Sequence, residues 1–243
     1  MASDPFNIRG VILSSREFKE KDRILTVITA DRGILSFCVK GAGSGKGKNS
    51  YTSVPFMLCD FVINPSGGFN YLKEGNIIES NSGIMNSLEA MAVAGHIGRV
   101  LSESVLQSDN SAKAYELCVY AFYVLGINPD RYSEVYCAFN WKLLNDLGFA
   151  SSYDISEPKS EYFLSLRDLY YSEVKTDGLF RISASAVKVL DYFATHEPKE
   201  IFNVTLSDSL KDELRRFTTQ YMQEQFEYEI KDPIKQLEIR LKR

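Results

Sequence analysis

The glycine- and lysine-rich segment at residues 40–48 has the residue types of a phosphate-binding loop. It reads Lys-Gly-Ala-Gly-Ser-Gly-Lys-Gly-Lys. A nucleotide-binding phosphate loop needs glycine where Lys40 stands and serine or threonine where Gly47 stands, and a dinucleotide-binding turn needs glycine where Lys46 stands. The segment therefore fits neither motif. Its lysines, Lys40, Lys46 and Lys48, instead suit sequence-independent phosphate contact, because lysine needs no fixed geometry and glycine lets the chain conform. A solvated surface loop is the alternative interpretation.

The charge distribution decides whether such a loop could attract a polyanion. The chain has 28 Lys and Arg against 32 Asp and Glu, a net charge of −4, so it is no uniformly basic nucleic-acid coat. Residues 1–50 nonetheless hold nine basic and five acidic residues, and no acidic residue lies between Asp31 and Asp60. Besides the lysines above, the basic residues expected to contact nucleic acid are Arg16, Lys19, Lys21, Arg23 and Arg32. The group at residues 16–23 is interleaved with acids, so it contributes only if the fold places it beside the lysines.

Aromatic side chains near these cations could stack on unpaired bases. The candidates in the first part of the chain are Phe18, Phe37, Tyr51, Phe69 and Tyr71. Phe37 lies in an alternating strand pattern, which indicates a core position. Phe18 and Tyr51 stand among polar residues, so we expect these two to be the stacking residues.

The sequence offers little to an enzyme. His96 and His196 have no nucleophile or metal ligand at motif spacing, and no zinc-protease or serine-hydrolase signature is present. Paired carboxylates such as Asp22 and Asp31 are the remaining catalytic option, but carboxylates on turns usually face solvent or cap backbone. We therefore expect a protein that is not an enzyme and that carries no cofactor.

Short β-rich runs separated by turn residues make up the first eighty residues. The runs are 8–15, 23–29, 34–39, 56–63 and 70–79, with turns at 31–33 and 64–68 and the glycine-lysine loop between them. Five closely spaced antiparallel strands favour a small closed barrel, which leaves no exposed sheet edge.

Beyond Ser80 the apolar period changes from two to 3.6, which predicts helices. They are expected at 82–106 with Ser82 as cap, at 112–125 and 132–147 with Gly126 and Gly148 as left-handed ends, from Ser183 or Ser185, and from Ser209 until Pro233 ends or kinks the last one. Residues 149–182 break the pattern and indicate an inserted excursion. The predicted class is α+β, an N-terminal barrel followed by a mostly helical domain.

The four cysteines are dispersed with no CxxC pair, each among apolar or aromatic residues, so we expect buried free thiols and a reducing, cytoplasmic location. No leader pattern and no apolar run long enough to cross a bilayer is present, so no membrane association is expected.

Three stretches resemble one bacterial family. Residues 10–26 (GVILSSREFKEKDRILT), 33–36 (GILS) and 39–42 (VKGA) look like the N-terminal domain of RecO recombination mediators. Residues 141–149 (WKLLNDLGF) resemble the helix that enters that family's excursion, and residues 214–217 (LRRF) its closing helix. The resemblance implies an OB-fold DNA-binding domain at 1–80 and a helical domain at 81–243, with a zinc-finger-like excursion at about 149–182.

The resemblance also implies function and partners. It suggests a nucleoid-associated mediator of DNA repair and recombination that binds single- and double-stranded DNA, anneals strands and helps load the recombinase with RecR on DNA coated by the single-stranded-DNA-binding protein. The acidic tail of that protein would bind the helical domain, where our candidates are Arg215 and Arg216 beside Leu214 and Phe217. Many relatives hold zinc with two CxxC pairs in the excursion, but residues 149–182 contain no Cys or His, so no metal is expected.

A different reading stays open. Without the resemblance, the residues also suit a cytosolic protein-interaction adaptor whose OB-like barrel binds peptide or protein and whose basic loop is incidental.

Overall fold

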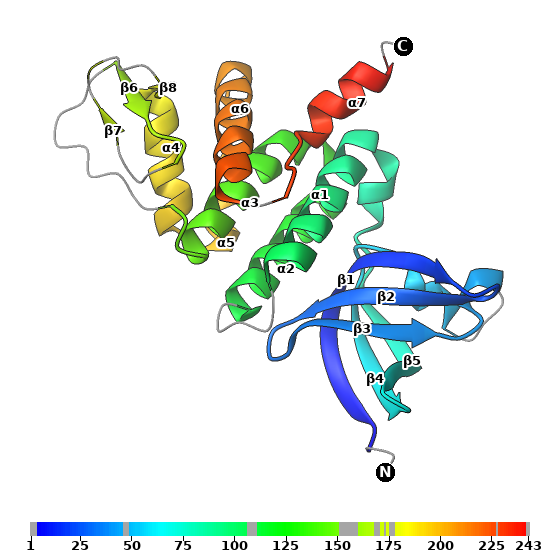
Figure 1. Cartoon of the computed structure of the whole chain (residues 1–243). Helices are drawn as coiled ribbons and strands as arrows, with labels where there is room; N and C mark the ends of the chain where they lie inside the picture. The colour runs from blue at the N-terminus through cyan, green and yellow to red at the C-terminus, as the bar shows by residue number, and fades with distance from the viewer. Residues whose placement is uncertain are drawn as a thin grey trace. The chain divides into compact units, whose positions relative to one another are not determined.

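The computed structural model describes residues 4–45, 49–105, 111–150, 160–167, 171–172, 174, 178–226 and 228–241. The chain forms two compact units, Met1–Pro129 and Asp130–Arg243 (Figure 1).

Five strands of the first unit close into a barrel in the order β1-β2-β3-β5-β4, which confirms the predicted OB fold. They are β1 (Phe6–Phe18), β2 (Asp22–Thr29), β3 (Gly33–Val39), β4 (Leu58–Ser66) and β5 (Phe69–Glu79). Neighbouring strands are antiparallel except β3 and β5, which meet in parallel through the pair Cys38 and Tyr71. Alternate side chains point inward, and the Phe37 and Phe61 rings pack edge to face with centroids 5.0 Å apart. Phe37 is therefore a core residue, as its pattern predicted.

Short 3-10 helices and two α-helices complete the first unit. These elements are η1 (Ala42–Ser44), η2 (Ser50–Ser53), η3 (Ser82–Asn86), α1 (Leu88–Ser104) and α2 (Ser111–Ile127). Helix α1 lies close to β1, because a Cβ on Gly98 would stand only 2.7 Å from the Leu13 carbonyl oxygen. The predicted boundary at residue 80 coincides with the end of the barrel strands, and α1 and α2 beyond it belong to the same compact unit as the barrel.

The second unit is mainly helical and carries a small sheet. Its elements, after the joining η4 (Pro129–Arg131), are α3 (Tyr132–Asp146), β6 (Glu161–Leu164), β7 (Tyr171–Ser172), β8 (Phe180–Ser183), α4 (Ala184–Thr195), α5 (Pro198–Ile201), α6 (Asp208–Gln225) and α7 (Pro233–Leu241). The sheet order is β7-β6-β8. Trp141 of α3 lies 5.6 Å from Phe217 and 5.4 Å from Tyr221 of α6, centroid to centroid. Phe180 of β8 lies 5.3 Å from Phe217, so the excursion is attached to this aromatic core.

Helix starts differ from the prediction at two serines. Ser82 begins a 3-10 helix without capping it, and α1 starts later, where the Ser87 hydroxyl accepts a hydrogen bond from the Ala90 N–H at 3.1 Å. Ser207 rather than Ser209 caps α6. Ser183 caps α4, one of the two positions expected. In each case several serines stand near the helix start, and tertiary packing selects one.

Helix ends differ as well. Gly126 does not end α2 but lies inside it, where a Cβ would come within 2.9 Å of the Asn81 backbone, so this glycine permits close packing on η3. Gly148 has φ of 81° just after α3, as expected of a left-handed end. Pro233 begins α7 instead of ending a helix, since proline needs no N–H donor at a first helical position.

Candidate nucleic-acid interface

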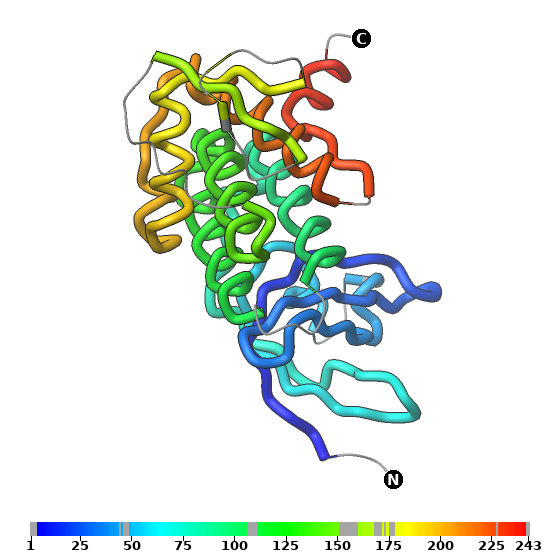
Figure 2. Tube along the Cα trace, turned by 60° about the vertical axis from the view of Figure 1, so that its left-hand side comes forward, coloured from blue at the N-terminus to red at the C-terminus, as the bar shows by residue number. Residues whose placement is uncertain are grey.

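A surface groove of about 240 Å³ lies along β2 and β3, between the turn that joins β1 to β2 and the turn that joins β4 to β5. Its basic residues are Arg16 and Lys19, and its aromatic edge is formed by the exposed Phe69 and the half-buried Phe18 and Tyr71. OB folds bind oligonucleotides on this face, with these two loops as its borders. Figure 2 shows both hairpins extending from the same side of the barrel.

Strand geometry explains why these side chains meet. Strand β1 continues beside β2 until Phe18 pairs with Asp22, and the chain then reverses at Lys19, which adopts a left-handed φ of 56°. On the facing border, Gly67 and Gly68 have φ of 59° and 80°, the conformation that a tight turn requires and that glycine adopts without strain. This turn leads directly into Phe69, whose side chain is 63% exposed.

Cations lie over two of the aromatic rings of the groove. The Lys40 Nζ is 4.8 Å from the centre of the Tyr71 ring, and the Lys19 Nζ is 5.3 Å from the centre of the Phe18 ring. Such pairs stabilise a ring in place while leaving the ammonium available to phosphate. Aromatic faces beside lysines are the combination that binds unpaired bases and their backbone.

The structure brings the two predicted basic clusters together. The Gly43 N–H donates to the Lys21 carbonyl oxygen at 2.9 Å, and the Gly41 N–H donates to the Asp22 carboxylate at 2.9 Å. The segment that follows Lys40 therefore lies against the β1–β2 turn. Lys46 and Lys48 lie outside the described residues.

The remaining basic candidates are placed differently. Arg23 is half-buried, with its Nε donating to the Ser15 Oγ at 2.8 Å, so its role is partly structural. Arg32 lies in the β2–β3 hairpin, with its guanidinium carbon 4.5 Å from the centre of the Phe6 ring, whereas the groove borders Ile24 near the start of β2. Strand β2 alone separates the two ends by roughly 23 Å at the usual rise per residue. Arg32 does not join this groove.

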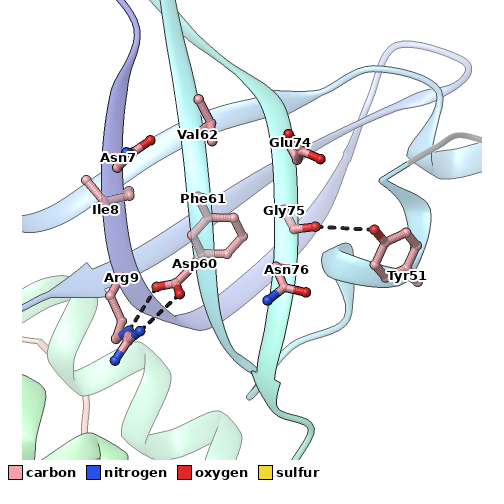
Figure 3. A pocket seen from close by; sticks show the side chains of 10 residues that line it. All are labelled: Asn7, Ile8, Arg9, Tyr51, Asp60, Phe61, Val62, Glu74, Gly75 and Asn76. Atoms are coloured by element: carbon pink, nitrogen blue, oxygen red, sulfur yellow. Dashed lines mark hydrogen bonds and ion pairs between the residues drawn. The ribbon is translucent and has the colours of Figure 1, made fainter.

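Tyr51 also lies elsewhere. It borders a second, larger groove of about 840 Å³ on β1, β4 and β5, and its hydroxyl donates to the Gly75 carbonyl oxygen at 3.2 Å (Figure 3). The Arg9 guanidinium holds the Asp60 carboxylate across this groove at 2.8 and 3.0 Å and lowers the pKa of that carboxyl by hydrogen bonding. Tyr51 therefore does not line the basic groove, and its expected stacking role stays a prediction. Phe69 and Tyr71 take its place in the basic groove.

The Asp22 and Asp31 pairing fails for the same geometric reason as Arg32, because these carboxylates stand at opposite ends of β2. His96 is buried in α1, and His196 Nδ1 lies 3.1 Å from the Tyr192 carbonyl oxygen. Among the described residues no group of three or more His, Cys, Asp or Glu side chains could hold a metal ion. The sequence prediction about zinc concerns residues 149–182, of which 151–159, 168–170, 173 and 175–177 lie outside the described residues, so it stays a prediction.

The four candidates for the tail of the single-stranded-DNA-binding protein lie on α6 with unequal exposure. Leu214 and Phe217 are fully buried. Arg215 pairs with Asp232 at 3.1 Å, Asp212 at 3.4 Å and Glu238 at 3.7 Å. Only Arg216 is exposed.

All four cysteines are free and buried, as predicted. Burial raises the pKa of the Cys59 thiol to about 12 and raises those of Cys118 and Cys137 further. Burial and the neighbouring Asp22 carboxylate raise that of Cys38. No helix of the described residues is long and apolar enough to cross a membrane.

The barrel topology and the groove on its β2–β3 face define an OB-fold protein with a helical second part. Family models for the N-terminal and C-terminal parts of recombination protein O match residues 1–81 and 85–233. The chain belongs to the recombination protein O family, which acts in DNA repair and recombination.

Similar proteins cover almost the whole chain. DNA repair protein RecO of Acetivibrio thermocellus is 25% identical over 229 residues, 90% of each chain. Those of Clostridium perfringens and a Thermoanaerobacter species are each 24% identical, over 86% and 91% of this chain and 88% and 93% of their own.

Proposed function

We propose that this protein is a non-enzymatic mediator that binds single- and double-stranded DNA through the basic groove of its barrel. The observation that carries the proposal is that Lys40 and Lys19 lie over the half-buried Tyr71 and Phe18 rings on the OB-fold binding face, which the exposed Phe69 also lines. Family membership supports a DNA-directed role.

The groove has different consequences for the two forms of DNA. Lysines contact phosphates of either form, because that attraction is independent of sequence and pairing. Phe69 and Tyr71 can stack only on bases released from the duplex. We therefore expect tighter binding to single strands, and annealing follows when two bound strands are brought together and pair.

Recombinase loading with RecR on DNA coated by the single-stranded-DNA-binding protein is the wider role we propose. For the acidic tail of the coating protein, Arg216 is the candidate that an exposed partner can reach on α6. Arg216→Glu should weaken binding of a tail peptide, and unchanged peptide affinity would place that site elsewhere.

The direct test replaces Lys40, Lys46 and Lys48 together by glutamate. Anisotropy titration of labelled oligothymidylate at low and high salt measures affinity and its salt dependence. Three lost phosphate contacts should flatten the slope of log K against log salt by about 2, and the melting temperature should hardly change because exposed charges contribute little to folding.

Glutamate replacements at Lys188, Lys199 and Lys235 form the matched control, because these exposed lysines lie on helices of the second compact unit. If the loop variant binds with unchanged affinity and slope, the loop lysines do not contact DNA, and the cluster from Arg16 to Arg23 becomes the candidate site. If replacement of Arg16 and Lys19 by glutamate also left affinity and salt slope unchanged, the protein-interaction adaptor would be favoured.

A further inference from the structure

One of the three acidic residues of the β1–β2 hairpin, Asp22, is partly withdrawn from solvent, whereas Glu17 and Glu20 are exposed. Asp22 opens β2 directly after the β1–β2 turn and is half-buried. Its Oδ1 accepts a hydrogen bond from the Gly41 N–H at 2.9 Å, and its Oδ2 lies 4.0 Å from the Cys38 Sγ. Both carboxylate oxygens thus face the end of β3. A carboxylate here repels phosphate, so its charge opposes DNA binding. Any favourable effect of Asp22 on DNA binding must come from its hydrogen bond to Gly41.

The segment that Asp22 contacts turns sharply and packs through its backbone and the buried Ala42. Gly41 and Gly45 have left-handed φ values of 72° and 67° at the two ends of η1. Between them, the Gly43 N–H donates to the Lys21 carbonyl oxygen at 2.9 Å, and a Cβ on Gly43 would stand 3.2 Å from the Lys21 backbone. The path of residues 41–45 is therefore held by the Asp22 carboxylate and the Lys21 carbonyl, in addition to the buried Ala42 and the hydrogen bond from the Ser50 hydroxyl to the Gly45 carbonyl at 3.2 Å.

Lys40 stands immediately before Gly41, the residue that the Asp22 carboxylate holds. Its ammonium lies over the Tyr71 ring of β5, across the seam where β3 and β5 close the barrel. If the Gly41 amide were released, the backbone that orients Lys40 would lose a hydrogen bond of the residue directly after it, while the β2–β3 pairing at Val39 remained. The lysines at 46 and 48 follow the same held segment in sequence.

We propose that Asp22 is a positioning residue that holds the lysine-bearing segment against the β1–β2 turn and so keeps Lys40 in the DNA-binding groove. This inference rests on the proposed function of that groove. The expected change in DNA affinity on removing Asp22 is opposite to the change expected from charge alone. Simple electrostatics says that removing an acid from a basic surface strengthens DNA binding, whereas positioning says that losing this acid weakens it.

Two variants separate charge from geometry. Asp22→Asn keeps an oxygen acceptor at the same distance from the backbone and removes the charge. Asp22→Glu keeps the charge and moves the acceptor by one methylene. We expect Asp22→Asn to bind oligothymidylate at least as tightly as the unaltered protein, and Asp22→Glu and Asp22→Ala to bind roughly three- to tenfold more weakly, the size of one net hydrogen bond.

Glu20→Gln and Glu20→Ala are the matched controls, because Glu20 is an exposed acid of the same turn. Both should bind slightly more tightly through charge alone. Hydrogen exchange gives the second readout: the Gly41 amide should be protected in the unaltered protein and in Asp22→Asn, and exposed in Asp22→Ala and Asp22→Glu. Melting temperatures of all variants identify any that fail to fold.

The inference is overturned if Asp22→Glu binds like the unaltered protein, or if Asp22→Ala binds more tightly, as the Glu20 variants do. The triple lysine variant, titrated in parallel, keeps the two proposals apart. A weakened lysine variant with unaffected Asp22→Glu refutes positioning alone. An unaffected lysine variant refutes DNA contact by the loop lysines, the part of the proposed function on which the positioning role rests.

Discussion

The Lys40 ammonium lies 4.8 Å from the centre of the Tyr71 ring, next to the pair of residues, Cys38 and Tyr71, through which β3 and β5 close the barrel. The pairing that closes the barrel is short, because Cys38 and Tyr71 are the one pair in register between β3 and β5 among the described residues. The same position carries the aromatic and cationic side chains of the candidate groove. Tyr71 therefore takes part both in closing the barrel and in lining the groove, so substitution of Tyr71 should affect both.

Phe69 offers a cleaner test of base stacking, because its ring is 63% exposed and outside the barrel core. Phe69→Ala should reduce affinity for single strands by about five- to a hundredfold, the range that one aromatic–base stack allows, and should affect duplex binding less. Anisotropy titration with both forms of DNA measures the difference. Tyr51→Ala is the control, since Tyr51 borders the other groove. Equal loss for single and double strands in Phe69→Ala would argue against stacking.

Arg215 should matter for stability rather than for partner binding. Its guanidinium pairs with Asp232, which is itself nearly buried, and with two further carboxylates. Arg215→Ala leaves Asp232 without its cation, and we expect a loss of about 2–3 kcal/mol, less than for a fully buried pair. Thermal unfolding followed by circular dichroism measures it. Arg216→Ala, exposed on the same helix, should leave the melting temperature unchanged; comparable losses in both variants would show that the ion pairs are not the cause.

The buried thiols predict a loss of stability at alkaline pH. Burial raises the pKa of Cys59 to about 12 in the folded chain and raises those of Cys118 and Cys137 as well, whereas an unfolded cysteine titrates near 8.5. Above that value only the unfolded chain releases these protons, so the stabilisation is complete below about pH 8.5 and declines as the pH rises. Urea unfolding across this pH range checks the slope. Cys118→Ala should reduce the slope, and a thiol reagent should react at neutral pH only after unfolding.

The absence of Cys and His from residues 149–182 predicts that the protein binds no zinc there, and this can be measured directly. Tyr162, Leu164 and Ile182 are buried there, so apolar packing is available in place of a metal. Elemental analysis of the purified protein should find no stoichiometric zinc, and a chelator should leave the melting temperature unchanged. One bound zinc per chain would contradict this expectation.

The sequence alone was sufficient for the barrel and for its core. Alternating apolar residues and glycine-rich turns are local signals, so the five strands and the inward Phe37 follow from short stretches of chain. Helix boundaries were less determined. Several serines stand near the starts of α1, α4 and α6, so the sequence does not show which one caps the helix. Gly126 indicated a helix end, but the structure needs glycine there because α2 packs closely on η3.

The site depended on tertiary structure for a different reason. Residue type shows that a side chain is basic or aromatic, but it cannot show which end of a strand the side chain reaches. Arg32 and Lys21 stand near the two ends of β2 and so belong to different surfaces, and Tyr51 and Phe69 face different grooves. In the sequence, Asp22 only reduces the net positive charge of residues 16–23. Its proposed role in positioning Lys40 rests on its hydrogen bond to Gly41, which only the structure shows. Composition and periodicity are properties of neighbouring residues, whereas a binding groove is made by strands whose order in space is set when the barrel closes.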